Sequence, residues 1–217
     1  LIDMTEIQTH PTVVPGNGEM ITEAVRGNGA ILVNHEGKRF YNELETRDNV
    51  SAAILKQTDK NAFLFFDSDM QKSLKATNNY IKQSYTVTGN SLDEIAAKMK
   101  VPAAALKQTM TEYAAAVAAK NDKQFGRADL PRPLNKAPFY AIIVTPAVHH
   151  CMGGIKIDTK TQVYGQNGQI IPGLFAAGEV TGGVHGGNRL GGNAQADIVT
   201  FGHIAGQQAY IYTRLNK

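Results

Sequence analysis

The sequence predicts a mixed α/β protein in which one continuous α+β domain is inserted into a second, discontinuous domain. Residues 1–12 and 146–217 are rich in glycine and in short strand patterns. Residues 13–145 instead alternate helical patterns with buried strands. The composition therefore shifts twice along the chain, and an insertion explains both shifts most simply.

A glycine-rich stretch at residues 178–193 (GEVTGGVHGGNRLGGN) is the most distinctive segment. Glycine loses much conformational entropy on folding, so this density is typical of backbone at positive φ or in close contact with a ligand. The apolar run 173–177 before it predicts a buried strand, and residues 194–210 after it predict a helix. Strand, glycine loop and helix N-terminus together indicate a cradle for an anion or cofactor, with a mobile surface loop as the alternative.

Composition narrows the function classes. The chain has 217 residues, of which 42% are hydrophobic, enough for one ample core or two modest ones. Its net charge of +3 is small and its basic residues are scattered, which disfavours nucleic acid or a membrane surface as a partner.

Cys151 is the only cysteine, which excludes an internal disulfide and a Cys-x-x-Cys metal or haem site within this chain. No apolar run is long enough to span a membrane. Because the chain begins at Leu1 without a methionine, we expect a fragment or processed product of something longer.

Local patterns predict the elements in order. We expect a strand over residues 1–7, whose polarity alternates weakly, and Pro11 just beyond it should stop the ladder because proline lacks an N–H. A strand that starts at Phe139 should run to Pro146. The other predicted elements are helices over 49–57, 67–75, 92–99 and 102–119, a helical turn and two short strands within 20–43, a buried strand over 62–66, and three short strands within 153–178.

Two helices carry specific signals. Ser91 with Glu94 predicts a capping box for residues 92–99. Pro102 suits a first helical position, and the helix that follows has an apolar stripe that predicts core packing, formed by Leu106, Met110, Tyr113 and Val117. Residues 120–136 are polar and contain two prolines, which predicts a connecting loop.

Several ionisable side chains stand at turns and boundaries, beside glycine, proline or other polar residues. Taken singly, each is more often structural or solvated than functional. Together they describe a positive pocket in which arginines, if convergent, could hold carboxylates by paired hydrogen bonds. Glu23 and Arg26 are three residues apart, one helical turn, so they can face each other and a third charge, which would suit a proton relay. The set comprises His10, Glu23, Arg26, Arg47, His149, His150, Glu179 and Arg189.

Other chemistries fit less well. His149 and His150 point to opposite faces of a regular strand, which disfavours a metal site at this pair, and we expect no metal. The absence of a Gly-x-Ser-x-Gly elbow disfavours a serine hydrolase. For Cys151 the favoured interpretation is a small buried packing residue, with a nucleophile as the alternative. His35 and His203 are expected to be surface or packing residues.

The motifs ITEAVRGNGAILVN, TRD, HHCMGG and GLFAAGEVTGGVHGGNRLGGNA, in this order and spacing, resemble the C-terminal part of the soluble fumarate reductase flavoproteins. The flavocytochrome c type, within the wider group of fumarate reductase, succinate dehydrogenase and L-aspartate oxidase, is the most similar. The resemblance implies that residues 1–12 and 146–217 belong to an FAD-binding domain and that residues 13–145 form a clamp, or capping, domain. It also implies an enzyme that reduces fumarate to succinate with FAD.

The resemblance implies a role for each candidate residue. Arg47 would donate the proton, and Glu23 and Arg26 would relay its replacement. The substrate would be bound by His10, Met20, Thr22, His149, Arg189 and Gly192. The residues that match FAD-contacting positions of the family are His150, Glu179, Ala194 and Gln195.

This chain also departs from the family. It lacks the Gly-x-Gly-x-x-Gly turn that binds the FAD pyrophosphate and the haem-attachment motifs of the flavocytochromes. We therefore expect that it cannot retain FAD alone, and that any haem c lies on a missing N-terminal domain. The expected partners are a small dicarboxylate, the missing flavin part of the same polypeptide and an electron-donor cytochrome, and the resemblance implies a periplasmic location.

Two alternatives to fumarate reduction stay open. The same frame could reduce another 2-enoate, such as urocanate or methacrylate, although His10 and Glu23 favour a compact dicarboxylate. A non-catalytic dicarboxylate-binding module is the alternative from another class, and the intact set of Glu23, Arg26 and Arg47 speaks against it.

Overall fold

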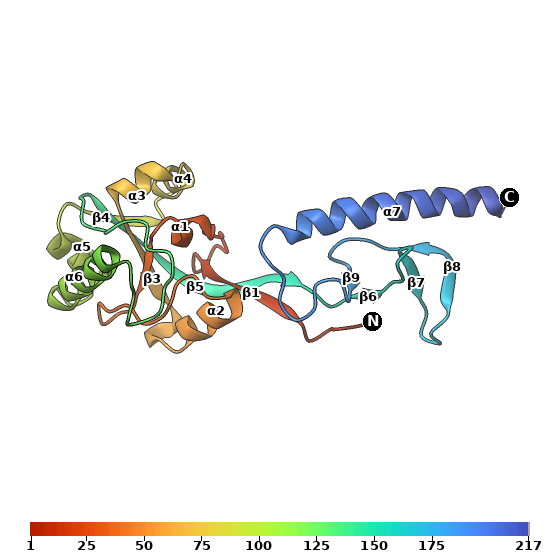
Figure 1. The fold of residues 1–217 in the computed structure, drawn as a ribbon, viewed down its shortest axis with the longest axis horizontal. Coiled ribbons are helices and arrows are strands. Elements are labelled where there is room, and N and C mark those ends of the chain that lie inside the picture. The colour runs from red at the N-terminus through yellow and green to blue at the C-terminus, as the bar shows by residue number, and fades with distance from the viewer. Residues whose placement is uncertain (217) are drawn as a thin grey trace. The chain divides into compact units, whose positions relative to one another are not determined.

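The computed structural model describes residues 1–216; Lys217, the last residue of the predicted flavin-binding segment, lies outside the described residues. The chain forms two compact units. We call Leu1–Thr9 together with Val148–Lys217 the terminal unit, and His10–Ala147 the middle unit. The chain passes from one unit to the other within strands β1 (Ile7–Val13) and β5 (Phe139–Cys151) (Figure 1).

The middle unit is built on a five-stranded sheet with the strand order β1-β5-β3-β2, in which β4 also pairs with β5. The pairs β2/β3, β3/β5 and β4/β5 are antiparallel. Every residue of β3 is buried, because both of its faces are covered. The bounds of the other strands and helices of this unit are β2 Ile31–Val33, β3 Ala62–Asp67, β4 Thr86–Gly89, α1 Ala24–Gly27, α2 Arg47–Leu55, η1 Thr58–Lys60, α3 Ser68–Ser73, α4 Ala76–Lys82, α5 Leu92–Met99 and α6 Ala103–Ala119.

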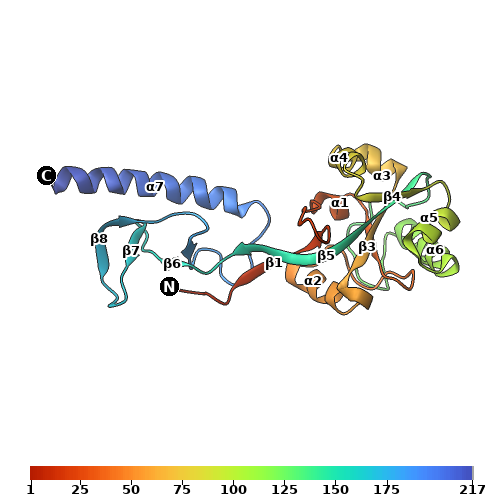
Figure 2. The same ribbon diagram turned by 180° about the vertical axis from the view of Figure 1, so that it is seen from behind.

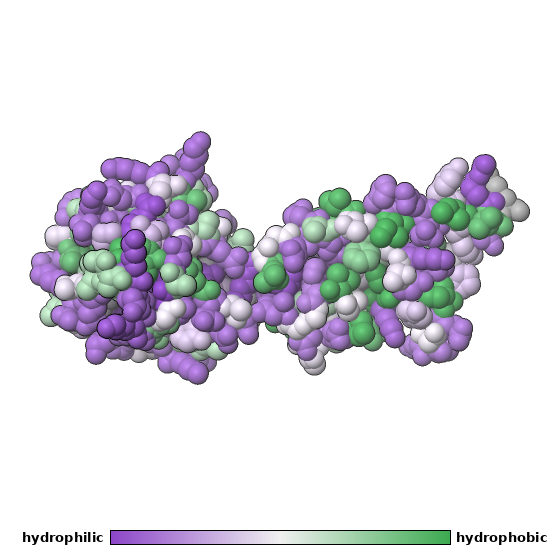
Figure 3. Space-filling view, in the orientation of Figure 1, coloured by the Kyte–Doolittle hydropathy of each residue, from purple (hydrophilic) through white to green (hydrophobic). Residues whose placement is uncertain are grey.

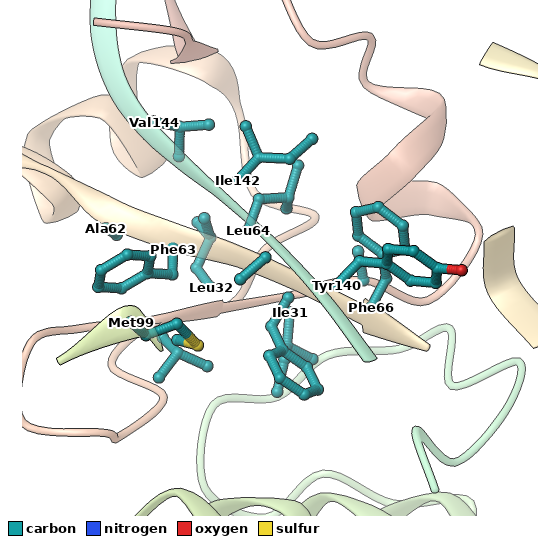
Figure 4. Packing of buried hydrophobic residues seen from close by; sticks show 14 of the residues in the cluster. Ile31, Leu32, Ala62, Phe63, Leu64, Phe66, Met99, Tyr140, Ile142 and Val144 are labelled. Atoms are coloured by element: carbon teal, nitrogen blue, oxygen red, sulfur yellow. The ribbon is translucent and has the colours of Figure 1, made fainter. Parts of the chain in front are cut away.

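The large hydrophobic core lies entirely in the middle unit, between Val14 and Val144. Aromatic side chains from neighbouring strands stack in it: the rings of Phe66 and Tyr140 are 5.3 Å apart at an interplanar angle of 17° (Figure 4). Full burial of such a side chain stabilises the fold by roughly 1.5–3 kcal/mol. This core fixes the sheet and the helices that carry the candidate site residues.

Helices α5 and α6 lie side by side in both views (Figures 1 and 2). The first half of the predicted capping box is confirmed, since Ser91 Oγ accepts from the Glu94 amide at 3.1 Å. The second half differs, because Glu94 Oε2 accepts from the Asn90 amide at 2.8 Å and not from the Ser91 amide. Helix α6 starts at Ala103, one residue later than predicted, and Pro102 is its N-cap residue. The predicted stripe is confirmed, since Leu106, Met110 and Tyr113 are buried and Val117 packs against the core.

The strand predictions were wrong at two prolines. β1 runs from Ile7 to Val13 through Pro11, where residues 1–7 were expected. β1 is the last strand in the order of its sheet, where a proline is tolerated because every second N–H points away from the neighbouring strand. β5 continues through Pro146 to Cys151. Its partner β3 starts at Ala62, opposite Val144, so Pro146 lies beyond the β3 ladder. Helix α4 and strand β4 were not predicted.

The terminal unit consists of short strands and one long helix. Its elements are β6 Ile155–Lys156, β7 Gln162–Tyr164, β8 Ile170–Phe175, β9 Thr181–Gly182 and α7 Asn193–Leu215. β6 pairs parallel with β9, and β7 pairs antiparallel with β8. The strand before the glycine loop was expected to be buried, but β8 is largely exposed, because it pairs only with β7 and has α7 on one side. Among residues 1–216, no helix is long and apolar enough to cross a membrane.

Much apolar surface is exposed on the terminal unit, as the green areas around α7 in Figure 3 show. Asp197 is the single buried side chain among the described residues of α7, a helix of 23 residues. Exposed apolar patches of this kind mark interaction surfaces. The exposed large apolar side chains include Val148, Ile171, Leu174, Val180, Leu190, Ile198, Val199, Tyr210, Ile211 and Leu215.

Candidate functional site

An arginine–carboxylate pair lies at the centre of the candidate site in the middle unit. Glu23 is the N-cap residue of α1, and Arg47 is the first residue of α2. Arg47 Nε donates to Glu23 Oε1 at 2.6 Å, and Arg47 Nη2 donates to Glu23 Oε2 at 2.9 Å. This is the side-on, bidentate geometry in which a guanidinium binds a carboxylate most strongly.

A second guanidinium reaches the same carboxylate. Arg26 Nη2 lies 3.6 Å from Glu23 Oε1, as the spacing of three residues predicts. Arg26 is 3% exposed, and its Nη1 donates to the main-chain carbonyl of Glu43 at 2.5 Å. One carboxylate oxygen is therefore within ion-pair distance of both Arg26 and Arg47.

The surroundings shift the pKa of Glu23 and the pKa of Arg26. The hydrogen bonds from Arg47 lower the pKa of Glu23 to about 2, against the opposing effect of burial, and the charges of Arg47, Arg26 and His10 lower it further. Burial lowers the pKa of Arg26, opposed by the charge of Glu23 and reinforced by that of Arg47. At neutral pH Glu23 is therefore ionised, and the protonated form of Arg26 is less favoured than in water.

Three further predicted residues lie on the elements that lead into α1. His10 is buried on β1, and its Nδ1 lies 3.5 Å from Thr12 Oγ1. Met20 forms an isolated bridge with Val13 and is exposed. The Thr22 amide donates to the hydroxyl of Tyr80 on α4 at 3.1 Å.

In the terminal unit, Arg189 is buried and held by β1. Its Nη2 donates to Gln8 Oε1 at 3.1 Å, and its Nη1 donates to the Leu190 carbonyl at 3.0 Å. Gln8 Nε2 in turn donates to the Arg189 carbonyl at 2.6 Å. The Arg189 guanidinium is thus oriented by Gln8 and by the Leu190 carbonyl. Arginine is also the side chain best suited to binding a carboxylate by two hydrogen bonds.

The two predicted histidines differ in burial, as expected of neighbours that point to opposite faces of a strand. His149 is half-buried, whereas His150 is buried with its Nδ1 3.4 Å from Glu179 Oε2. Burial lowers the pKa of His150, against the charge of Glu179. Cys151 was expected to be buried but is exposed, because it ends β5, where its amide donates to Glu179 Oε1 at 2.9 Å.

The glycine loop contains two kinds of glycine. Gly182 is structural, since an added Cβ would meet the main-chain nitrogen of Gly154 at 2.5 Å. Gly186 and Gly192 have φ of +62° and +84°, and a Cβ on either would meet nothing within 4 Å. Gly192 is the N-cap of α7 and provides no side-chain cap, while Ala194 and Gln195 lie in the first turn. No side chain caps the N-terminus of this long helix, and there is space beside Gly186 and Gly192 of the preceding loop.

Two groups of functional interest were missed by sequence reasoning. His185 Nε2 lies 3.1 Å from Asp197 Oδ2, and the His185 ring packs edge-on against that of His150 at 5.5 Å. A buried ionic cluster also contacts Arg26 of α1. Its members are scattered in sequence from residue 39 to residue 127, so no local pattern could have found them.

The site residues thus form two groups, one in each unit. His10, Met20, Thr22, Glu23, Arg26 and Arg47 lie in the middle unit. His149, His150, Glu179, Arg189, Gly192, Ala194 and Gln195 lie in the terminal unit. The fold and the site define a two-unit α/β protein with buried arginines suited to anionic ligands.

Comparison with known proteins gives the family. Residues 1–194 match the model of the FAD binding domain family, and the chain belongs to that family. It is 53% identical over 216 residues to a fumarate reductase (cytochrome) of Shewanella frigidimarina, covering 100% of this chain and 38% of that protein. It is 47% identical over 209 residues to an NADH:fumarate oxidoreductase of Klebsiella pneumoniae (strain 342), covering 96% of this chain and 23% of that protein.

A solved structure agrees. The open conformation of a flavocytochrome c3 fumarate reductase matches with a TM-score of 0.79 and 45% identity, covering 97% of this chain and 37% of that one. The resemblance to fumarate reductase flavoproteins and the predicted fold class are therefore confirmed. The chain spans little more than a third of the length of the Shewanella relative.

The terminal unit fits a large polar cofactor such as FAD. Within residues 1–216, His150 Nε2 and Asp197 Oδ1 are buried without a hydrogen-bond partner, although buried polar atoms normally have one. They lie in the same unit as the uncapped N-terminus of α7 and the open backbone of Gly186. A ligand with both donors and acceptors would satisfy these groups.

Proposed function

We propose that the protein of which this chain is part reduces fumarate to succinate with FAD as its cofactor. The observation that carries the proposal is the Glu23 carboxylate shared by two buried guanidinium groups, Arg26 and Arg47. Arginines alone can bind an anion, without a carboxylate between them. Proton delivery needs such a carboxylate, because Glu23 can pass a proton from Arg26 to Arg47.

We assign the terminal unit to FAD binding and the middle unit to the clamp. His150, Glu179, Ala194 and Gln195 would hold the cofactor, with the α7 N-terminus favouring negative charge on it. FAD, when bound, supplies the hydride that adds to one alkene carbon of the substrate. The chain's own residues bind the two carboxylates and donate the proton.

Arg47 donates the proton to the other alkene carbon. A guanidinium is a weak acid in water, so its proton must be replaced as soon as it leaves. Glu23 can do this, because the Arg47 hydrogen bonds are the main cause of its low pKa. Once Arg47 has lost its proton, that effect disappears and the Glu23 carboxylate accepts a proton more readily. Arg26, whose pKa burial already lowers, passes one to Glu23, and Glu23 passes it to Arg47.

The substrate carboxylates are assigned to the remaining residues. Arg189 supplies a guanidinium, and His10, Thr22, His149 and the backbone of Gly192 supply further polar contacts. Met20, which is 41% exposed, is assigned to contact with the carbon skeleton. These roles rest on the resemblance to the family and on the burial and orientation of Arg189.

Two alternatives use the same residues. Another 2-enoate, such as urocanate or methacrylate, would need the same proton donor but a different set of carboxylate contacts. A non-catalytic dicarboxylate-binding module would need Arg189 and the histidines, but not the joined Glu23, Arg26 and Arg47. We therefore place fumarate reduction first.

The partners are proposed on the family likeness. The exposed apolar side chains of α7 and β8 would be covered by further residues of a longer polypeptide that complete the FAD site. A cytochrome would supply electrons, and any haem c would lie outside this chain. A periplasmic location is proposed on the same likeness, and cell fractionation would test it.

The decisive experiment is turnover by the FAD-loaded protein of which this chain is part, with a reduced viologen dye as electron donor. Fumarate-dependent oxidation of the dye, with succinate formed in equal amount, is expected. Urocanate and methacrylate are tested in parallel at equal concentration. Faster turnover of either would replace fumarate as the substrate, and binding of dicarboxylates without any turnover would support the non-catalytic module.

A further inference from the structure

A buried ionic cluster contacts Arg26 of α1, and the proton delivery proposed above assigns it no role. It consists of Arg39, Glu43, Asp122 and Arg127, none more than 6% exposed. Arg39 Nε and Nη2 donate to the two oxygens of Glu43, both at 2.9 Å, and Nη2 also donates to Asp122 Oδ2 at 2.9 Å. Arg127 Nη1 donates to Glu43 Oε2 at 3.1 Å.

The cluster is balanced and well satisfied. It contains two cations and two anions, and Glu43 Oε1 accepts a further hydrogen bond from the Leu32 amide at 3.2 Å. The Arg39 guanidinium also lies over the Tyr113 ring, 5.0 Å from its centroid. Charged groups of this kind are often no more stabilising than well-packed apolar ones. The cluster is therefore weak evidence for added stability, and its hydrogen bonds to the main chain hold particular groups in place.

The groups that the cluster fixes belong to Arg26. Arg127 Nη2 donates to the main-chain carbonyl of Arg26 at 2.7 Å, and Arg127 Nη1 donates to that of Ala30 at 2.9 Å. These bonds hold both ends of the turn that follows α1. The main-chain carbonyl of Glu43 accepts from Arg26 Nη1 at 2.5 Å. The backbone and the guanidinium of Arg26 are thus both attached to members of the cluster.

Arg26 has few other restraints. Within residues 1–216, its buried Nε has no hydrogen-bond partner. Its contact with Glu23 is an ion pair at 3.6 Å, longer than a hydrogen bond. The direction in which Nη2 points therefore depends on the bond to the Glu43 carbonyl and on the position of the Arg26 backbone.

We propose that Arg127 and Glu43 are positioning residues that aim Arg26 Nη2 at Glu23 for proton delivery. This inference rests on the proposed function and adds two residues to it. In each cycle an N–H bond of Arg26 breaks as an O–H bond forms on Glu23, that proton then forms an N–H bond on Arg47, and water returns a proton to Arg26. A misplacement of about 1 Å at such a transfer lowers the rate about a hundredfold.

The test compares Arg127→Lys with Asp122→Asn in the FAD-loaded protein. Lysine keeps the charge at position 127 but cannot reach both carbonyls and Glu43 at once. Asp122 belongs to the same cluster but contacts Arg39 and the loop of Arg127, not Arg26. Arg127→Lys is expected to lower kcat about ten- to a hundredfold, with the KM for fumarate within about twofold, FAD content unchanged and a larger solvent deuterium isotope effect on kcat. Asp122→Asn is expected to keep kcat and the isotope effect.

A second variant and a second readout cover other outcomes. If Arg127→Lys does not fold, Glu43→Gln takes its place, because it keeps the main-chain carbonyl and weakens the grip on Arg127. Amide hydrogen exchange at residues 27–30 gives a readout that needs no turnover, and it should speed up in Arg127→Lys but not in Asp122→Asn. Equal kcat and equal exchange in the two variants would overturn the inference. If the wild-type protein does not reduce fumarate, the proposed function fails, while the exchange data still decide whether Arg127 positions Arg26.

Discussion

Arg47 donates to both oxygens of Glu23, from Nε at 2.6 Å and from Nη2 at 2.9 Å. The pair joins the start of α2 to the start of α1, two short helices that are neighbours only through the fold. Arg26 approaches the same carboxylate from the buried side. A surface ion pair would contribute little, but this one is partly enclosed and its two hydrogen bonds engage both oxygens of the carboxylate.

Glu23→Gln tests the carboxylate. The amide keeps the size of the side chain but cannot carry a proton between the arginines, so kcat is expected to fall about 10²- to 10⁴-fold. FAD content should not change. Steady-state assays with fumarate and a reduced dye measure the effect. Glu45→Gln is the matched control, because Glu45 is exposed and two residues from Arg47. A kcat of Glu23→Gln equal to that of the control would remove Glu23 from the relay.

Arg47→Lys tests the proton donor. Lysine preserves the charge but cannot form the side-on fork with Glu23, so we expect turnover to be nearly abolished, a loss of at least about 10²-fold. Arg132→Lys is the control, since Arg132 is half-buried and donates to the Asp69 carbonyl, away from Glu23. Assays at equal FAD occupancy separate loss of chemistry from loss of cofactor. Substantial rescue by lysine would show that charge, not the fork, is what matters.

The ionisation of Glu23 gives a prediction about pH. Its pKa is about 2, against an ordinary value of 4.5, so the stability it contributes is present above pH 4.5 and is lost as the pH falls from 4.5 towards 2. The contribution is modest, because the Glu23 side chain is 39% exposed. Carbon-13 NMR of the Glu23 carboxyl should show no titration between pH 6 and about 3 in the wild-type protein.

Arg47→Gln should restore an ordinary titration. The largest cause of the low pKa is removed, so the Glu23 midpoint is expected to move up towards 4.5. Glu94, which is paired with Lys98, serves as an internal reference because its environment does not change. An unchanged Glu23 midpoint in this variant would mean that Arg26 or His10, and not Arg47, holds the carboxylate ionised.

Short-range chemistry made much of the fold predictable. Ser91 and Glu94 start α5, and Leu106, Met110 and Tyr113 place α6 on the core. Errors occurred where the meaning of a residue depends on long-range pairing. Pro11 is tolerated in β1 because this strand lies at the end of the sheet order. The order of strands in a sheet cannot be predicted from a local sequence pattern.

The candidate site was predictable to a similar degree. The i,i+3 contact of Glu23 and Arg26 follows from helix geometry, but the fork from Arg47 joins residues 24 positions apart and needed the fold. Arg127, 101 positions from Arg26, lies in a segment that has the composition of an ordinary polar loop. Arg127 is buried because Glu43 and main-chain carbonyls pair with its guanidinium. No periodic pattern in the sequence indicates these partners.

Tyr80→Phe tests how Thr22 is held. The tyrosine hydroxyl accepts the Thr22 amide at 3.1 Å, and removing it leaves a half-buried N–H without that acceptor, which costs roughly 1–3 kcal/mol. Because Thr22 is proposed to contact the substrate, we expect the KM for fumarate to rise about three- to tenfold, with a smaller effect on kcat. Tyr85→Phe, at a half-buried tyrosine of the same unit, should leave KM unchanged. Equal KM in both variants would exclude a role for Tyr80 in substrate binding.

Gly186→Ala tests whether the glycine loop faces the cofactor. Gly186 has a φ of +62°, and a Cβ there would have no atom within 4 Å, so alanine adds backbone strain of about 1–2 kcal/mol without a clash inside the chain. Gly168 is the matched control, since it has a φ of +76°, equally open space and a place in the hairpin between β7 and β8. The two variants should therefore lose similar unfolding free energy. If FAD lies against the loop, Gly186→Ala alone should lower FAD occupancy, measured from flavin absorbance per polypeptide after gel filtration. Equal occupancy in the two variants would mean that the loop glycines serve the backbone path and not cofactor contact.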